Sequence, residues 1–154
     1  EMCIRDSSYL TADGRWVDRE ASELDFSYRH SAFEENGACI LGAVFHLEKG
    51  NPDAIKARMN ELMQKRIDKQ PLDKPSAGST FKRPQGAFAG KLIEDCGLRG
   101  FTVGGAQISE KHCGFVINRG GATCADVLAL IEKVQKTVYD AHGVMLEPEV
   151  KIIR

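Results

Sequence analysis

The chain has 154 residues, which is long enough for one domain with a hydrophobic core or for a small domain and part of a neighbour, and we favour the second. Its 21 basic and 22 acidic side chains nearly cancel, which argues against binding to nucleic acid or to an anionic membrane surface. No apolar run reaches the roughly 18 residues of a membrane span and no signal-peptide pattern begins the chain, so we expect a soluble, cytoplasmic protein.

The first fifty residues predict extended structure. Residues 1–8 lack periodicity and resemble translated sequencing-adaptor sequence, so we interpret them as a suspected sequencing artefact. Ala12, Asp13 and Gly14 are turn residues between two short extended pieces, which predicts a hairpin. Residues 39–47 are dense in branched and aromatic side chains between two glycines, and this pattern predicts a buried strand.

A helix is predicted to begin after Asn51, whose side chain can cap it, with Pro52 at the first helical position. Its apolar stripe is expected to lie in the core. That stripe contains Ile55, Met59, Leu62 and Met63. Residues 69–86 contain three prolines and are predicted to form a long loop, a kind of segment that often carries function.

The remaining elements alternate in type, as in an α+β domain. A long helix is predicted to begin after Thr123, with Asp126 suited to its N-terminal turn, and to end at Gly143. The shorter elements are a predicted helix over residues 87–95 and predicted strands over residues 101–103, 106–108, 115–118, 144–146 and 150–153.

The five cysteines are odd in number and show no CxxC spacing, so we expect small buried side chains in a reducing compartment. His30, His46 and His142 have no acidic or cysteine partner at metal-ligand spacing, and no metal site is expected. Gly104 and Gly105 do not follow a strand in GxGxxG form, so they are not a dinucleotide fingerprint.

Several ordered motifs lie between residues 77 and 150. They occupy residues 77–84, 89–94, 97–100, 104–112 and 146–150. Together they resemble the UDP-N-acetylenolpyruvoylglucosamine reductase (MurB) family, and residues 26–33 resemble its segment where the flavin-binding part approaches the C-terminal domain. The resemblance covers roughly residues 12–154.

The resemblance implies a fold and an activity. Residues 9–50 would be the C-terminal remnant of an FAD-binding domain, and residues 51–154 an α+β substrate-binding C-terminal domain. The family belongs to peptidoglycan synthesis. In it NADPH reduces FAD, and hydride then passes to UDP-N-acetylglucosamine enolpyruvate to give UDP-N-acetylmuramate. We expect this chain to be inactive without the missing N-terminal FAD-binding domain of the same protein.

By match to the family motifs, Ser79 is the proton donor and Glu149 stabilises the enol intermediate. A serine hydroxyl is a weak acid, so it must act through its position. An ionised carboxylate would repel a developing anion, so we expect Glu149 to be protonated, or bridged to a cation, at that step. The family's catalytic arginine would lie before Tyr28 and is assigned to no residue here.

Three cations gather around the loop that contains Gly78: Lys69, Lys82 and Arg83. This local positive charge is expected to bind the substrate diphosphate. The resemblance implies that role for Lys69 and Arg83, although some members carry asparagine at the position of Arg83. Tyr28 matches a tyrosine that closes over the nucleotide sugar in some members. The cofactor-binding residues stay unknown and mostly upstream.

Without the resemblance, Gly78-Ser79 would be an ordinary turn and Glu149 an exposed or capping carboxylate. His112 precedes an apolar strand and is expected to be structural rather than a general base. The alternative function is a truncated, non-catalytic UDP-sugar-binding module that lacks the flavin domain.

Overall fold

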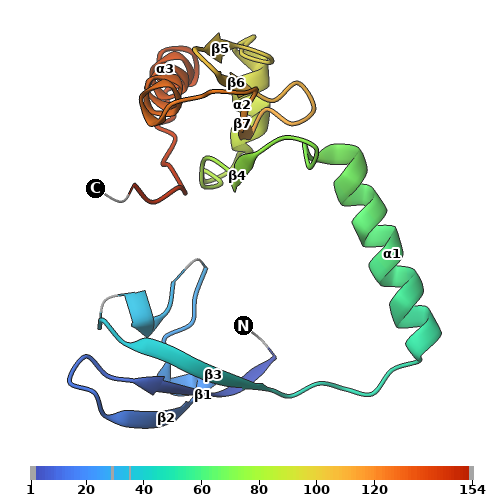
Figure 1. Cartoon of the computed structure of the whole chain (residues 1–154), viewed down its shortest axis with the longest axis vertical. Helices are drawn as coiled ribbons and strands as arrows, with labels where there is room; N and C mark the ends of the chain where they lie inside the picture. The colour runs from blue at the N-terminus through green and yellow to red at the C-terminus, as the bar shows by residue number, and fades with distance from the viewer. Residues whose placement is uncertain (1–2, 29, 35, 153–154) are drawn as a thin grey trace. The chain divides into compact units, whose positions relative to one another are not determined.

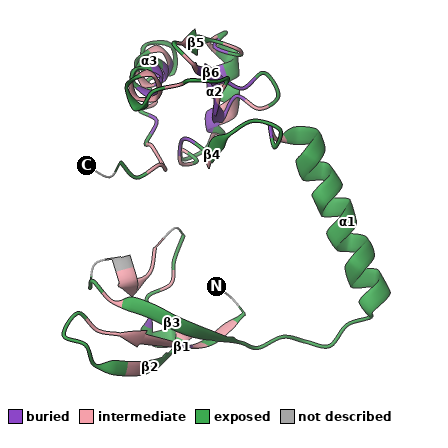
Figure 2. Ribbon diagram, in the orientation of Figure 1, coloured by how far each residue is buried: buried purple, intermediate pink, exposed green. Residues whose placement is uncertain are grey.

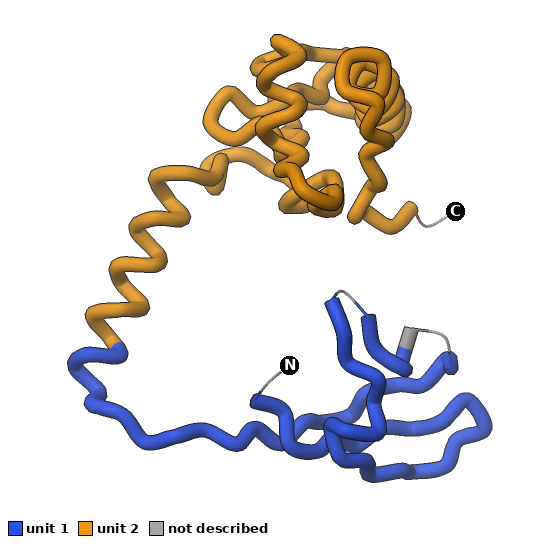
Figure 3. The backbone as a smooth tube through the Cα atoms, turned by 180° about the vertical axis from the view of Figure 1, so that it is seen from behind, with its two compact units in different colours: residues 1–55 blue, residues 56–154 orange. Residues whose placement is uncertain are grey.

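The structure is a computed structural model, and it describes residues 3–28, 30–34 and 36–152. The chain divides into two compact units, residues 1–55 and 56–154, shown in two colours in Figure 3. Within the described residues, no helix has both the length and the apolar character needed to cross a membrane.

The first unit is a three-stranded antiparallel sheet in the order β2-β1-β3 (Figure 1). The strands are β1 (Ile4–Leu10), β2 (Trp16–Glu20) and β3 (Cys39–Phe45), with short 3-10 helices at Ala21–Glu23 and Ala32–Glu34. The predicted hairpin is confirmed, because Leu10 pairs with Trp16 across a turn in which Gly14 has φ +81°. The interpretation of residues 1–8 as an artefact stays a prediction.

The prediction of a buried strand over residues 39–47 is wrong in its burial. A strand does form there, but every residue of β3 is exposed, and Figure 2 shows it green throughout. The side chains of Ile40 and Phe45 are 54% and 56% exposed. The physical reason is that one three-stranded layer cannot enclose its own apolar side chains. Of the described residues in this unit, only Leu24 is a buried apolar side chain.

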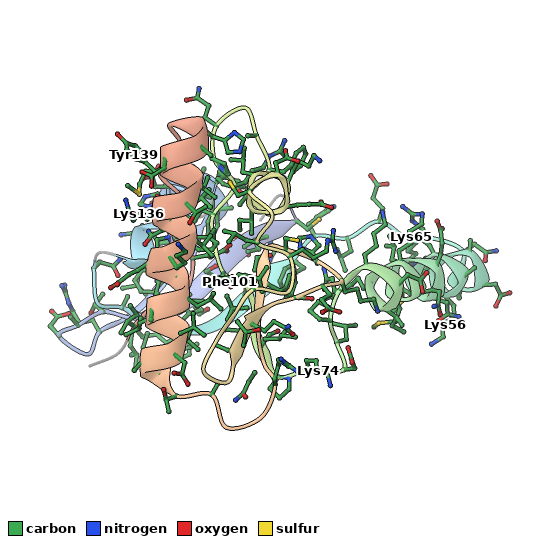
Figure 4. All side chains as sticks on the ribbon, turned by 90° about the horizontal axis from the view of Figure 1, so that it is seen from above. Lys56, Lys65, Lys74, Phe101, Lys136 and Tyr139 are labelled. Carbon is green, nitrogen blue, oxygen red and sulfur yellow. The ribbon has the colours of Figure 1, made fainter. Side chains whose placement is uncertain are left out.

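Helix α1 (Pro52–Lys69) begins as predicted, because the Asn51 side chain accepts a hydrogen bond from the Ala54 amide at 3.0 Å. The expectation of a core stripe is wrong: Met59 and Leu62 are 58% and 44% exposed. Amphipathic spacing orders apolar side chains on one face, but burial also needs a partner surface. Figure 4 shows Lys56 and Lys65 projecting from this helix.

The second unit holds a four-stranded antiparallel sheet in the order β4-β7-β6-β5. Its elements are β4 (Ser76–Ser79), α2 (Ala89–Asp95), β5 (Thr102–Val103), β6 (Ala106–Ile108), β7 (Phe115–Asn118) and α3 (Cys124–His142). Helices α2 and α3 contact each other, and α3 contacts β5 and β6. The fully buried apolar side chains between these elements are Ile93, Ala106, Ile108, Leu130, Val134, Val138 and Leu146.

The termini of α3 confirm the sequence prediction. The Asp126 amide donates to Thr123 Oγ1 at 3.1 Å, and the Thr123 amide donates to Asp126 Oδ2 at 2.9 Å, which is a capping box. The helix ends at Gly143, with φ +68°. On its outer side, Lys136 and Tyr139 project away from the sheet (Figure 4).

Gly104 and Gly105 allow the β5–β6 turn to approach this capped terminus. A Cβ on Gly104 would lie 2.3 Å from Asp126 Oδ1, and one on Gly105 would lie 2.4 Å from the Ala122 amide nitrogen. Gly105 also donates its amide to Asp126 Oδ2 at 3.4 Å. The pair therefore serves close packing in this fold.

Three further expectations need correction. The predicted loop over residues 69–86 contains β4, because residues 76–79 find a partner strand in β7. Residues 144–152 form no strand and pair only through an isolated bridge between Phe81 and Pro148. Proline cannot donate to a ladder, which limits further pairing there. All five cysteines are free, but only Cys113 is buried.

Candidate functional site

Ser79 is the last residue of β4, and its backbone is fixed on both sides. Within β4 it pairs with Phe115 of β7. The next residue, Thr80, is buried, donates its amide to the Gly114 carbonyl at 2.8 Å and accepts the Val116 amide on Oγ1 at 3.1 Å. The residue before it, Gly78, has φ +83°, a conformation that favours glycine. Ser79 is therefore an exposed hydroxyl on a firmly held backbone.

The segment that carries Glu149 runs antiparallel to the residues after Ser79. The Glu149 amide donates to the Thr80 carbonyl at 2.9 Å, and the Lys82 amide donates to the Glu147 carbonyl at 2.8 Å. Phe81 and Pro148 face each other between these two bonds. That is a non-hydrogen-bonded position, where proline needs no donor. The fold thus brings together the segments of the two residues that the sequence predicts as catalytic.

The same segment is also attached to α3 and to a side chain after β4. Leu146 is fully buried, and its carbonyl accepts a hydrogen bond from Gln135 Nε2 at 2.8 Å. Lys82 Nζ forms an ion pair with Glu147 Oε1. Sequence reasoning missed Thr80, Gln135 and Glu147 as residues that hold this arrangement. Glu147 and Thr80 lie inside the quoted motifs, but Gln135 stands in a helix with no motif to mark it.

The predicted substrate-binding residues fall in different places. Arg83 follows Lys82, and its guanidinium lies 4.0 Å from the centroid of the exposed Phe88 ring. Such a contact still leaves planar N–H donors for an anion. Lys69 is the exposed last residue of α1. Tyr28 lies in the first unit and is 72% exposed.

Helix α1 is fixed near Lys69 by a neighbouring loop of the second unit. Lys111 Nζ donates to the carbonyl of Ile67, one of the last-turn carbonyls of the helix. A cation at a helix C-terminus also interacts favourably with the helix dipole. The fold therefore restrains the backbone that carries Lys69.

His112 makes contacts that agree with the expected structural role. Its Nδ1 accepts the Gly114 amide at 3.0 Å, and its ring meets Phe115 edge-on at 5.1 Å between centroids. A Cβ on Gly90 would lie 3.2 Å from the ring, so the imidazole is closely enclosed.

Two groups of this unit with shifted pKa values, Asp126 and Cys113, have structural roles. Hydrogen bonds from the Thr123 and Gly105 amides lower the pKa of Asp126, and those bonds belong to the cap of α3. Burial raises the pKa of the Cys113 thiol, which keeps it neutral and weakly nucleophilic. Within the described ranges, no three His, Cys, Asp or Glu side chains lie close enough together to hold a metal ion.

An apolar pocket of about 540 Å³ lies beside the paired segments. Thr80 and Val150 contribute to it from those segments, and Leu128 and Ile131 from α3. An FAD would need several N–H or cationic partners for its pyrophosphate. Lys151 is the single charged side chain among the described residues of the lining. This pocket therefore does not fit an FAD.

Comparison with known proteins identifies the kind of domain. A family model described as UDP-N-acetylenolpyruvoylglucosamine reductase, C-terminal domain, matches residues 70–153. The crystal structure of the UDP-N-acetylenolpyruvylglucosamine reductase from Thermus caldophilus superposes with a TM-score of 0.85 at 33% identity, covering 99% of this chain and 53% of that one. The fold is thus the α+β C-terminal region of a reductase, and the strands β1, β2 and β3 of the first unit precede it in the chain.

Two curated relatives carry the same name. The reductase of Agathobacter rectalis is 60% identical over 148 residues, which are 96% of this chain and 47% of that protein. The reductase of Lachnoclostridium phytofermentans is 54% identical over 151 residues, which are 98% of this chain and 49% of that protein. The chain belongs to the UDP-N-acetylenolpyruvoylglucosamine reductase family, and it spans about half the length of the curated relatives it matches.

Proposed function

We propose that this chain is the substrate-binding C-terminal part of a cytoplasmic flavoenzyme of peptidoglycan synthesis. The complete protein would reduce UDP-N-acetylglucosamine enolpyruvate to UDP-N-acetylmuramate, with NADPH as reductant and FAD as carrier. In this proposal residues 9–50 end the FAD-binding domain and residues 51–154 form the substrate-binding domain. The flavin supplies hydride and is held mainly by upstream residues.

The observation that carries the proposal is the pairing of the two candidate catalytic segments. The Glu149 amide donates to the carbonyl of Thr80, the residue directly after Ser79, so Glu149 lies opposite the neighbour of Ser79 although the two residues are far apart in the sequence. A turn serine and a capping carboxylate with unrelated roles would not need this arrangement. The family match supports the same assignment.

The proposed chemistry concerns a proton and a developing charge. When hydride reaches one alkene carbon, negative charge spreads from the other carbon into the adjacent carboxylate. Ser79 would donate its hydroxyl proton to that carbon, and Glu149, protonated or bridged to a cation, would stabilise the enol form. A weak acid can act here only if it is held in place. The backbone bonds on either side of Ser79 provide such restraint.

Substrate contacts are proposed for three residues. Lys69 and Arg83 would contact the diphosphate, because both are exposed cations on restrained segments. Tyr28 would close over the nucleotide sugar. Lys82 as a further phosphate contact stays a prediction, and its ion pair with Glu147 competes with that role.

A second candidate function concerns the chain by itself, whose matched residues cover 47% of the Agathobacter rectalis relative. Without the upstream half, the chain would be a non-catalytic module that binds a UDP-sugar. This reading is compatible with the same substrate contacts, so flavin content and turnover must separate the two.

The test joins this chain to the upstream half of the Agathobacter rectalis relative and compares the product with the chain alone. We expect the joined protein to carry flavin absorbance and to consume NADPH continuously, beyond the single equivalent that reduces its flavin, only when the enolpyruvyl substrate is added. The chain alone should show neither. If the joined protein binds flavin but never turns over, while the chain alone binds the UDP-sugar in calorimetry, the binding-module function is correct.

A further inference from the structure

We infer that Lys82 and Glu147 form a positioning pair that holds the Glu149 segment against the Ser79 segment. This inference rests on the proposed function for its kinetic consequence, but its structural part can be tested without it. The pair is a side-chain contact between two segments that the sequence separates by most of the second unit. Neither residue would touch the reacting atoms.

The backbone geometry shows why a side-chain pair is useful here. Among the residues that the structure describes, two backbone hydrogen bonds join these segments, one on each side of Phe81 and Pro148. Proline contributes no donor, and the bridge does not continue into a ladder. Such a short pairing opens readily unless something else holds it.

The side chains of Lys82 and Glu147 lie where an ion pair between them can hold the two segments together. Lys82 and Glu147 are directly opposite each other in the antiparallel pairing, since the Lys82 amide donates to the Glu147 carbonyl. Opposite residues share a face of a strand pair, so the ammonium and carboxylate meet side by side. The two side chains are 40% and 68% exposed, so the pair is accessible to solvent and modest in strength.

This segment is also attached on both sides of residues 147–149. Gln135 of α3 donates to the Leu146 carbonyl just before Glu147, and Val150 packs against the hydrophobic core just after Glu149. Breaking the ion pair should therefore loosen residues 147–149 without releasing Leu146 or Val150 from the core. The expected defect is local motion of Glu149 rather than loss of the fold.

The structural test is amide hydrogen exchange by NMR on the chain of residues 1–154. We expect Lys82→Met and Glu147→Gln each to speed exchange of the Glu149 amide by about two- to fivefold, in line with an exposed ion pair. The Asn118 amide, which donates to the Pro75 carbonyl at 2.8 Å, should keep its rate. The charge swap K82E/E147K should restore the Glu149 rate.

A matched control breaks another exposed ion pair of the same unit. Lys136 Nζ lies 3.1 Å from Asp140 Oδ2 on the outer side of α3, so Lys136→Met removes a similar contact elsewhere. It should leave the Glu149 amide unchanged. Unchanged Glu149 exchange in both Lys82→Met and Glu147→Gln would overturn the inference, whatever the activity of the joined protein.

The kinetic test uses the protein joined to the upstream half of the relative. A positioning role predicts that both single variants lower kcat several-fold at nearly constant KM for the enolpyruvyl substrate, and that K82E/E147K recovers it. If Lys82 instead bound phosphate, Lys82→Met alone would raise KM and the swap would not rescue it. That second pattern contradicts the positioning pair.

Discussion

The Glu149 amide donates a hydrogen bond of 2.9 Å to the Thr80 carbonyl, and this contact joins the C-terminal segment to the end of β4. Thr80 is buried and bonds in turn to Gly114 and Val116. Thr80 therefore connects the backbone of Glu149 to the four-stranded sheet of the second unit. The geometry of the candidate site therefore depends on tertiary pairing, because the local sequence of either segment cannot hold Ser79 and Glu149 near each other.

Thr80→Val should destabilise the second unit by about 1–3 kcal/mol. The substitution keeps the shape but leaves the buried Val116 amide without the hydroxyl oxygen that accepts its hydrogen bond. Urea unfolding followed by circular dichroism at the helical band measures the change. Thr102→Val is the matched control, since Thr102 is exposed, its hydroxyl donates to the Gly100 carbonyl, and the Gln107 Nε2 that reaches it at 3.5 Å also donates to the Gly100 carbonyl at 2.9 Å. An equal or larger loss in the control would contradict this account of Thr80.

Gly105→Ala should cost about 1–3 kcal/mol, because the new methyl group would lie 2.4 Å from the Ala122 backbone nitrogen and the β5–β6 turn would have to move. Gly42→Ala provides the comparison, since a Cβ there meets no atom within 4 Å. The two variants can be compared by their urea midpoints. A stable Gly105→Ala protein would show that the turn does not pack on the start of α3 as described.

Acid should weaken the cap of α3 through Asp126. Amide donors lower the pKa of this carboxylate in the folded state, so its contribution to stability is complete above the unfolded pKa, about 3.9, and is lost as the pH falls through the lower folded value. Asp126→Asn should flatten the stability profile over that acid range. Asp140→Asn, which removes an exposed charge from the same helix, should preserve it. The measurement is the urea midpoint between neutral and acid pH.

Glu149→Gln in the joined protein should slow turnover less than Glu149→Ala. If Glu149 acts as a neutral hydrogen-bonding group, glutamine preserves part of that function while alanine removes it, and losses of about 100-fold are typical for such a group. Rates of flavin reoxidation by the substrate measure the difference. Equal losses in both variants would instead favour the alternative in which the carboxylate bridges a cation.

The sequence predicts features that depend on neighbouring residues, such as helix caps, but it does not predict which apolar faces are buried by tertiary contacts. The cap at Thr123 and Asp126 depends on residues three apart, so its signal lies within one short segment. The exposed β3 strand and the exposed Met59 stripe carry the patterns of buried elements, because periodicity reports an apolar face and not its partner. Burial of such a face also requires a partner surface, which the pattern of one segment does not report.

The candidate site likewise combines residues that local motifs predict with contacts that only the tertiary structure shows. The motifs predict Ser79 and Glu149 as site residues, but the sequence predicts a loop where β4 forms, because the pairing of β4 with β7 joins residues that are distant in the sequence. The Gln135–Leu146 and Lys82–Glu147 contacts likewise depend on tertiary approach, for which a single sequence offers no spacing rule.

The most direct measurement is single-turnover reoxidation of the reduced flavin in the joined protein carrying Ser79→Ala. The account predicts that NADPH still reduces the flavin, while reoxidation by UDP-N-acetylglucosamine enolpyruvate slows by about 100-fold or more. Ser76→Ala, a change at the other end of β4, should reoxidise at the normal rate. Fast reoxidation in Ser79→Ala would contradict the assignment of Ser79 as the proton donor.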